Sequence, residues 1–132
     1  MYKVLKIHNY TATRDVELQN LDTETIDMCF DDSAVVSYSN FSFIEEGKIY
    51  DCKMELFGDF DHQKTDSNVV VTILESDVIV GNTKYFKVSI GSDIYYILMS
   101  DAKGFEVKKN MYYHFTRTDL IQVGNVIHDD CL

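Results

Sequence analysis

The chain has 132 residues, of which 45% are hydrophobic and 26% are charged, a composition typical of a folded globular protein. Its 22 acidic and 12 basic residues leave a formal net charge of −10. Nucleic-acid binding depends on cations that neutralise phosphates, so this balance makes nucleic acid an unlikely partner. We expect a single domain that spans residues 1–132.

The apolar segments of the chain are short. Lys6, His8 and Asn9 interrupt the first apolar residues, so the N-terminus does not read as a signal peptide. The longest apolar run, residues 94–99, is much shorter than a membrane-spanning helix requires. We therefore expect a cytoplasmic protein with no membrane association.

The three cysteines are Cys29, Cys52 and Cys131, an odd number at wide spacing with no Cys-x-x-Cys pair. This pattern argues against a disulfide framework and against a structural zinc site. Cys52 falls on an apolar strand face and is expected in the core, whereas Cys29 falls on an acidic face. Cys131 is expected to belong to a mobile C-terminal end. We expect no cofactor.

Alternation of apolar and polar residues predicts β-strands along most of the chain. The expected strands lie, in chain order, at residues 15–19, 26–31, 48–57, 69–74, 78–80, 84–90, 94–99, 105–107 and 111–115. The pair Gly81-Asn82 predicts a tight hairpin turn, and residues 91–93 predict a second turn. Helical spacing is indicated only near residues 32–36 and 116–122.

Many short strands separated by tight turns predict an all-β, mainly antiparallel domain with at most one or two short helices. The expected architecture is a small single-domain β-barrel of the oligonucleotide/oligosaccharide-binding (OB) type. An up-and-down barrel is the main alternative, and a sandwich of two sheets is a further one. The oligomeric state stays open at this stage.

Acidic residues are densest between Asp15 and Asp32. Alternation places Asp15 and Glu17 on one face of their strand, and Asp27 and Asp31 on one face of the next. If the two strands pair, these acids form a ribbon on the solvent side. Like charges across a strand pair are destabilising, so such a ribbon suggests a role in steering a basic partner. The alternative is that the acids only keep the protein soluble.

Adjacent tyrosines occur twice, as Tyr95-Tyr96 and as Tyr112-Tyr113. In a strand, one ring of each pair faces the core and the other faces outward. An outward tyrosine can anchor a protein partner or stack on a ligand. The alternative is that these rings cover a small core and leave their hydroxyl groups in water.

The polar segment 59–68 is the one candidate for a metal site. Oxygen ligands of the kind that Ca²⁺ and Mg²⁺ prefer are gathered there with a histidine, as Asp59, Asp61, His62 and Asp66. The EF-hand spacing fails, because Lys64 stands where the loop needs glycine and Val70 where it needs glutamate. A solvated loop is therefore the favoured interpretation, and no bound metal is expected.

Small size, acidity and the lack of a nucleophile motif favour a non-enzymatic acidic binding protein for a basic protein partner. An immunity or inhibitor protein that masks the positive site of a toxin is one such protein. The expected binding residues are Asp15, Glu17, Asp27, Asp31, Asp32, Tyr112 and Tyr113. The alternatives are a small-molecule or oligosaccharide-binding β-barrel, an enzyme with an unrecognised carboxylate or metal site, and a module that self-associates through a strand edge.

Overall fold

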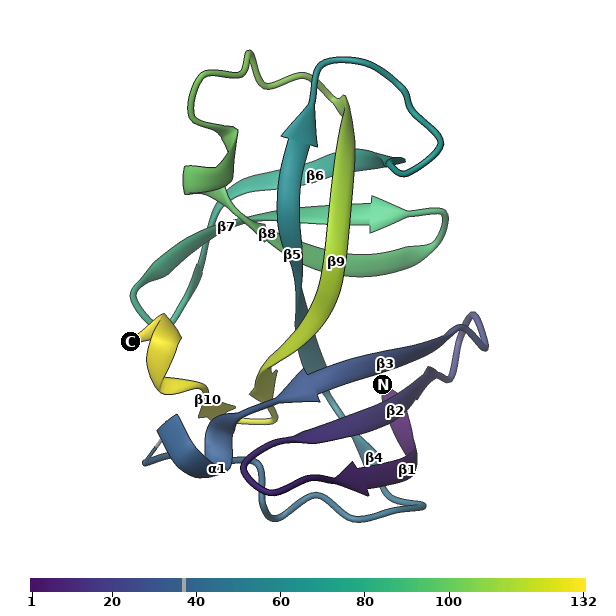
Figure 1. Cartoon of the computed structure of the whole chain (residues 1–132), viewed down its shortest axis with the longest axis vertical. Helices are drawn as coiled ribbons and strands as arrows, with labels where there is room; N and C mark the ends of the chain where they lie inside the picture. The colour runs from purple at the N-terminus through teal and green to yellow at the C-terminus, as the bar shows by residue number, and fades with distance from the viewer. Residues whose placement is uncertain (37) are drawn as a thin grey trace.

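The computed structural model describes residues 1–36 and 38–132. For Val36 it describes the backbone only. The described residues form one mixed sheet of ten strands and very little helix (Figure 1). The strands are β1 (Tyr2–Asn9), β2 (Arg14–Asn20), β3 (Ile26–Asp31), β4 (Ile49–Tyr50), β5 (Cys52–Asp61), β6 (Val69–Val80), β7 (Thr83–Ile90), β8 (Asp93–Leu98), β9 (Asn110–Val123) and β10 (Val126–Ile127). One short helix, α1 (Ser33–Val36), and two 3₁₀ turns, η1 (Met99–Ala102) and η2 (Asp129–Cys131), complete the chain.

The expectation of a mostly β domain is confirmed. Most strand pairs are antiparallel, but β3 pairs with β9 and β5 pairs with β8 in parallel, which makes the sheet mixed. The predicted hairpin is also confirmed, since Val80 lies opposite Thr83 across Gly81 and Asn82. Gly81 has a φ of 63°, the left-handed conformation that glycine adopts without strain. Across the described ranges, no helix has the length and apolar character needed to cross a membrane.

Two of the expected elements are wrong. Residues 116–122 are not helical but belong to β9, where Thr118 and Leu120 are buried and the intervening Asp119 is not. This period of two suits a strand, and pairing with β3 and β5 satisfies the backbone there. Residues 105–107 form no strand and instead connect η1 to β9. The segment is short and largely exposed, so it lacks the buried face that would hold a strand.

Two long strands, β5 and β9, run from the upper end of the molecule down to the lower lobe and join the two lobes (Figure 1). The upper lobe contains β6, β7, β8 and η1, and the lower lobe contains β1 to β4 and α1. In the upper lobe the pairings run β5–β8–β7–β6–β9 and return to β5. In the lower lobe they run from β9 through β3, β2 and β1 to β4, which leads directly into β5.

The two long strands, which pair along their length, approach each other closely at Gly58. A Cβ atom at this position would lie 1.9 Å from the carbonyl oxygen of His114 on β9. The pairing shifts register between Phe57 and Gly58, so the irregularity and the close approach coincide. A glycine is required there because any side chain would push the two shared strands apart.

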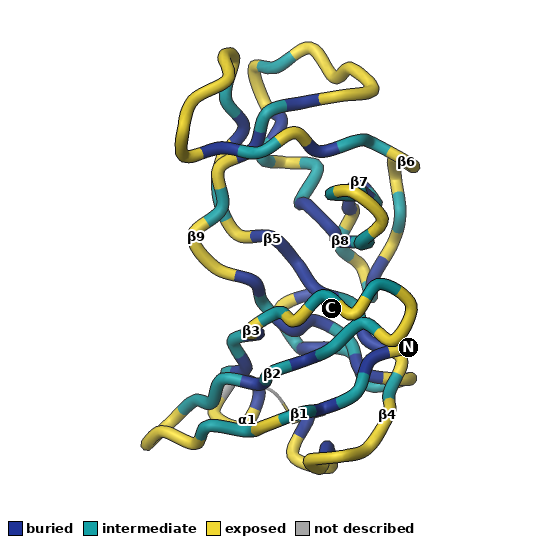
Figure 2. The backbone as a smooth tube through the Cα atoms, turned by 90° about the vertical axis from the view of Figure 1, so that its right-hand side faces the viewer, coloured by how far each residue is buried: buried dark blue, intermediate teal, exposed yellow. Residues whose placement is uncertain are grey.

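The core has two parts. The main cluster fills both lobes around β5 and β9. Figure 2 shows the middle of β9 as exposed, with buried residues toward both of its ends. A second cluster lies on the other side of β8 and contains Val80, Tyr85, Tyr96, Ile121 and Cys131. Tyr95 therefore packs in the main cluster while Tyr96 packs in the second, with 5% and 8% of their surfaces exposed. The expectation that one ring of this pair faces solvent is wrong, because β8 is covered on both faces.

The C-terminal end is docked, which corrects the expectation that Cys131 is mobile. Cys131 is 1% exposed, and its carbonyl oxygen accepts hydrogen bonds from the Asn82 amide at 2.7 Å and the Thr83 hydroxyl at 2.9 Å. A Cβ atom at Gly81 would lie 2.5 Å from the same oxygen. The hairpin turn between β6 and β7 therefore holds η2 against the upper lobe.

Candidate functional site

A cleft of about 220 Å³ opens between the two lobes, over the outer face of β5 and β9. Its apolar lining includes Phe30, Phe57, Leu98 and Ile121. The titratable side chains that line it, thiol and hydroxyl groups aside, are Asp32, Glu55, Arg117, Asp119, His128 and Asp130. These residues come from both lobes and from the docked C-terminal end, so only the tertiary fold brings them together. We call this the interlobe cleft.

Strand register places the central carboxylates side by side. Glu55 of β5 lies directly opposite Asp119 of β9, and Asp119 lies opposite Phe30 of β3, which in turn lies opposite Asp15 of β2. Directly opposite residues point to the same face and bring their Cβ atoms within about 5.5 Å of each other. One row of side chains therefore runs from Asp15 across Phe30 to the Asp119–Glu55 pair.

Glu55 is the most buried acid of the interlobe cleft, with 9% of its surface exposed. The Tyr85 hydroxyl donates a hydrogen bond to its Oε1 atom at 2.9 Å, and the Cys131 thiol lies 3.3 Å from the same hydroxyl. Oε2 has no hydrogen-bond partner among the described residues. Every fully buried side-chain oxygen of the described residues has a hydrogen-bond partner. Since Oε2 has none, it is not fully buried, and solvent reaches it in the cleft that Glu55 lines.

Burial raises the pKa of Glu55, and the neighbouring charges of Asp119 and Asp101 raise it further. The hydrogen bond from Tyr85 and the charge of Arg117 lower this pKa in part. A carboxyl group in a cleft with a raised pKa and a specific charged neighbour is typical of functional sites. Burial also raises the pKa of Tyr85 and of Cys131, so both remain protonated at neutral pH.

Arg117 closes one edge of the cleft. Its Nε and Nη2 atoms donate to the two carboxylate oxygens of Asp119 at 2.5 and 3.0 Å. Its guanidinium carbon lies 4.6 Å from the ring centres of both Phe30 and Phe57, so the group is held between two aromatic faces. Bidentate pairing and aromatic stacking are the two contacts that suit a guanidinium best.

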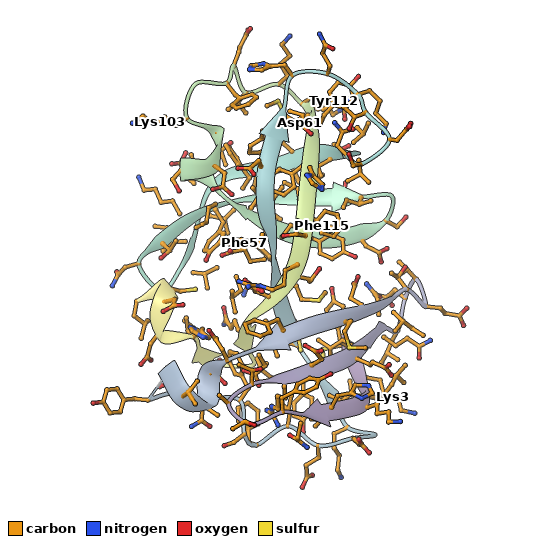
Figure 3. All side chains as sticks on the ribbon, viewed as in Figure 1. Lys3, Phe57, Asp61, Lys103, Tyr112 and Phe115 are labelled. Carbon is orange, nitrogen blue, oxygen red and sulfur yellow. The ribbon has the colours of Figure 1, made fainter. Side chains whose placement is uncertain are left out.

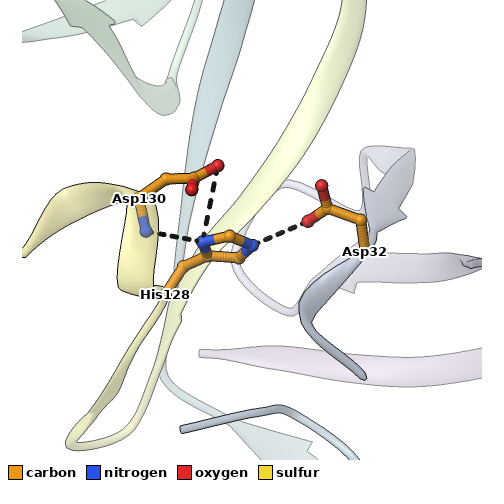
Figure 4. A group of neighbouring side chains, drawn as sticks. All are labelled: Asp32, His128 and Asp130. Atoms are coloured by element: carbon orange, nitrogen blue, oxygen red, sulfur yellow. Dashed lines mark hydrogen bonds and ion pairs between the residues drawn. The ribbon is translucent and has the colours of Figure 1, made fainter. Parts of the chain in front are cut away.

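His128 ties the C-terminal end to the lower lobe (Figure 4). Its Nδ1 atom accepts a hydrogen bond from the backbone amide of Asp130 at 3.0 Å, so in the neutral ring the proton lies on Nε2. Nε2 then donates to Oδ1 of Asp32 at 2.6 Å. Both nitrogens of this 4% exposed residue are thereby engaged.

Asp32, His128 and Asp130 are the one described group of at least three His, Cys, Asp or Glu residues close enough to share a metal ion, with candidate ligand atoms within 4.8 Å of one another. A metal ligand must present a free lone pair, and the imidazole presents none. Binding at Nδ1 would displace the amide of Asp130, and binding at Nε2 would displace the proton given to Asp32. The arrangement therefore fits a structural tie better than a metal site.

The four residues of the predicted metal loop do not form a common set of ligands. Asp61 accepts a hydrogen bond from the Asn68 amide at 2.9 Å, and the His62 ring stacks on Phe105 at 4.3 Å. Asp59 and Asp66 are exposed. Figure 3 shows Asp61 beside Tyr112 at the upper end of the molecule, away from Phe57, which lines the interlobe cleft.

The predicted acidic ribbon is wrong on the second strand. Asp31 and Cys29 face inward, at 2% and 0% exposure, while Ile26 and Met28 face solvent at 57% and 47%. Alternation shows which residues share a face but not which face is buried. Here Arg14 of β2 reaches inward and donates from Nε to Asp31 at 2.7 Å, so the acid is buried as half of an ion pair.

Asp27, on the same inner face, is half-buried and accepts a hydrogen bond from the Tyr95 hydroxyl at 2.8 Å. Burial raises its pKa. Asp15 and Glu17 do lie on the outer face, as expected. Their partners across the strands are His8 and Lys6 of β1 on one side and apolar residues of β3 on the other.

The two predicted tyrosines lie at the upper end of β9. Tyr113 is fully buried, and its hydroxyl lies 3.0 Å from the Leu56 carbonyl oxygen and 3.1 Å from Oδ2 of Asp101. Tyr112 is half-buried and lines a shallow hollow with Asp61 and His62. For this pair, only one ring belongs to the core, as expected.

Four residues of the cleft are not among those expected from the sequence: Glu55, Tyr85, Arg117 and Asp119. Two features of the sequence could have indicated them. Glu55 is a single acid between apolar residues of a predicted strand, and Arg117 and Asp119 are two residues apart and share a face of β9. Comparisons with protein-family models, curated protein sequences and solved structures found no match. Function must therefore be inferred from the chemistry of the cleft.

Proposed function

We propose that the chain is a non-enzymatic acidic binding protein for a basic protein partner, of the immunity or inhibitor kind, and that the partner covers the interlobe cleft. One observation carries the proposal. Among the described residues that line the cleft, four carboxylates face a single guanidinium, that of Arg117, which Asp119 already neutralises. The cleft thus keeps an excess of negative charge that only a cationic surface complements.

Exposed apolar side chains beside the cleft support a protein partner in particular. Phe57 lines the cleft and is 47% exposed, and Met28 and Ile26 continue the outer face of β3 from Phe30. Protein interfaces combine a desolvated apolar centre with a polar rim, and exposed apolar patches mark such surfaces. A small inorganic cation would make no use of these side chains.

Of the residues expected from the sequence, the proposal keeps Asp15, Glu17 and Asp32. Asp15 belongs to the row that leads to Glu55, and Asp32 lines the cleft. Asp27 and Asp31 are engaged by Tyr95 and Arg14, so they support the surface from within.

We further propose that the circuit of pairings in the upper lobe is a small closed barrel of the OB type. The five pairings that lead from β5 back to β5 support this. Its interior is occupied by buried side chains such as Phe86, Val88, Ile97 and Tyr113. A small-molecule or oligosaccharide ligand would have to displace these groups, so the cleft is the better binding site.

The three thiols are unpaired, which suits the cytoplasmic location that we also propose.

The test compares two triple variants that remove the same charge. Asp32→Asn, Asp119→Asn and Asp130→Asn change the cleft, whereas Asp59→Asn, Asp66→Asn and Glu106→Gln change exposed acids elsewhere. Purified wild-type protein is used to capture partners from native lysate at low and high salt, and association rates are then measured for each variant. We expect one stoichiometric basic partner whose association slows, with a flatter salt dependence, for the cleft variant only. Equal slowing by both variants would overturn the assignment of the cleft.

A further inference from the structure

We infer that the interlobe cleft is a receptor for one ammonium or guanidinium group, which the open oxygen of Glu55 binds directly. The inference rests on the proposed function, because in the complex this group belongs to a lysine or arginine side chain of the partner. It goes further by assigning the ligand chemistry and the residue that binds it.

The state of Glu55 is the first support. The residue is about nine-tenths buried, yet only Oε1 has a hydrogen-bond partner, and Oε2 faces the cleft. A buried carboxylate that lacks a full set of partners is costly for a folded protein. A bound cation removes this cost by donating a charge-assisted hydrogen bond to Oε2.

The size of the cleft is the second support. Pockets for drug-sized ligands occupy roughly 300–1,000 Å³. At about 220 Å³, the interlobe cleft is smaller than this range and suits one small polar head group with part of its stem. Leu98, Leu120 and Ile121 line it as well, and they can contact the methylene groups of such a stem.

Arg117 provides a third support, because it shows the same chemistry within the molecule. The residue is held by two phenyl rings and by a bidentate carboxylate at the edge of the cleft. The neighbouring space offers the open oxygen of Glu55 together with Asp32 and Asp130, and no second described cation lines it. A second cationic group therefore finds carboxylates that Arg117 leaves free.

Binding is expected to release a proton at acidic pH. The titratable and charged groups that face Glu55 come from five elements: Tyr85 of β7, Tyr96 of β8, Asp101 of η1, Arg117 and Asp119 of β9, and Cys131 of η2. Their combined effect with burial raises the pKa of Glu55. A cation binds the ionised carboxylate, so affinity rises with pH as Glu55 loses its proton.

The experiment uses ethylguanidinium as the probe and ethylurea as its uncharged isostere. Binding to the whole chain is measured by NMR chemical-shift changes and by calorimetry in two buffers of different ionisation enthalpy. We expect ethylguanidinium to bind and ethylurea not to bind. Glu55→Gln should weaken binding at least about tenfold and abolish the proton release. The control Glu106→Gln changes an exposed acid that does not line the cleft and should leave binding unchanged.

The glutamine side chain still offers an oxygen to the Tyr85 hydroxyl, so Glu55→Gln is expected to fold, which its thermal unfolding checks. Unchanged probe binding by a folded Glu55→Gln, or equal binding of ethylurea, would overturn the inference. If a basic partner binds Glu55→Gln as tightly as wild type, the proposed function stands and this inference fails. If the probe depends on Glu55 but no basic partner is captured, this cation site stands and the proposed function fails.

Discussion

The two lobes meet on both sides of β5 and β9, and the two contacts use their carboxylates differently. On one side, Asp93 of β8 accepts hydrogen bonds from Thr23 at 2.5 Å and from Thr25 at 2.7 Å, one on each carboxylate oxygen. We call this contact the threonine clasp. On the other side, Glu55 has one oxygen held by Tyr85 and the other open to the interlobe cleft.

This difference shows how one type of side chain serves two purposes. A carboxylate with both oxygens satisfied joins two elements, and it has little to offer a ligand. A carboxylate with one oxygen held and one open is oriented by its partner and keeps an acceptor for another molecule. The clasp therefore joins the two lobes, whereas Glu55 keeps an open oxygen in the cleft between them.

The largest expected effect comes from forcing apart the two strands that both lobes share. Gly58→Ala places a Cβ atom where only 1.9 Å separates it from the His114 carbonyl oxygen, so β5 and β9 must separate. We expect a loss of about 3 kcal/mol or more in the free energy of unfolding, since backbone cannot yield as a flexible side chain does. Urea unfolding measures this loss. A loss below about 1 kcal/mol would show that the two strands do not pack tightly at Gly58.

The next largest effect comes from removing the threonine clasp while leaving the lining of the interlobe cleft unchanged. Asp93→Ala leaves both threonine hydroxyls of the clasp without their acceptor, and we expect a loss of about 2 kcal/mol in unfolding free energy. The cleft lining does not include Asp93, so the affinity for ethylguanidinium should fall only if the lobes move. Wild-type affinity in a destabilised variant would show that the clasp serves stability alone. Thr72→Val, which removes a hydroxyl from an exposed hydrogen bond near the start of β6, is the matched control.

A smaller effect concerns pH. Burial raises the pKa of both Asp27 and Glu55 in the folded protein. A carboxyl group with a raised pKa binds more protons when folded, so its contribution to stability is full below its unfolded pKa, near 4, and is lost as pH rises through the folded value. Asp27→Asn and Glu55→Gln should each flatten this decline in unfolding free energy between acidic and neutral pH. Only Glu55→Gln should also weaken cation binding; weaker binding in both variants would contradict the separation of the two contacts.

The sequence predicted the coarse fold because alternation and turn residues are local signals. The hairpin at Gly81-Asn82 and the strand at residues 84–90 needed no knowledge of the rest of the chain. The predicted orientation of β3 was wrong because the inward face is set by a tertiary contact, the ion pair of Asp31 with Arg14 inside the lower lobe. The helix predicted at residues 116–122 was wrong because a strand there depends on pairing with β3 and β5, which a single sequence does not show.

The cleft was harder to predict than the fold for the same reason. Its members come from β3 and the residue that follows it, from β5, β7, β8 and β9, and from the C-terminal end, and no two of the key acids are close in sequence. The sequence did single out acidity, and Asp32 was among the predicted residues. What it lacked was the register that sets Glu55 opposite Asp119, and the docking of Cys131 that covers Tyr85.

The smallest expected effect tests how Arg117 shares the cleft with a ligand. Arg117→Ala removes a partly exposed ion pair, so the unfolding free energy should change by less than about 1 kcal/mol. It also leaves Asp119 unpaired, which adds one net negative charge beside Glu55. If Glu55 is the primary ligand, ethylguanidinium should bind up to about fivefold more tightly, and the gain should vanish at high salt. Weaker binding would mean instead that Arg117 and its two phenyl rings form part of the receptor, with the incoming group stacking on the guanidinium that is already there.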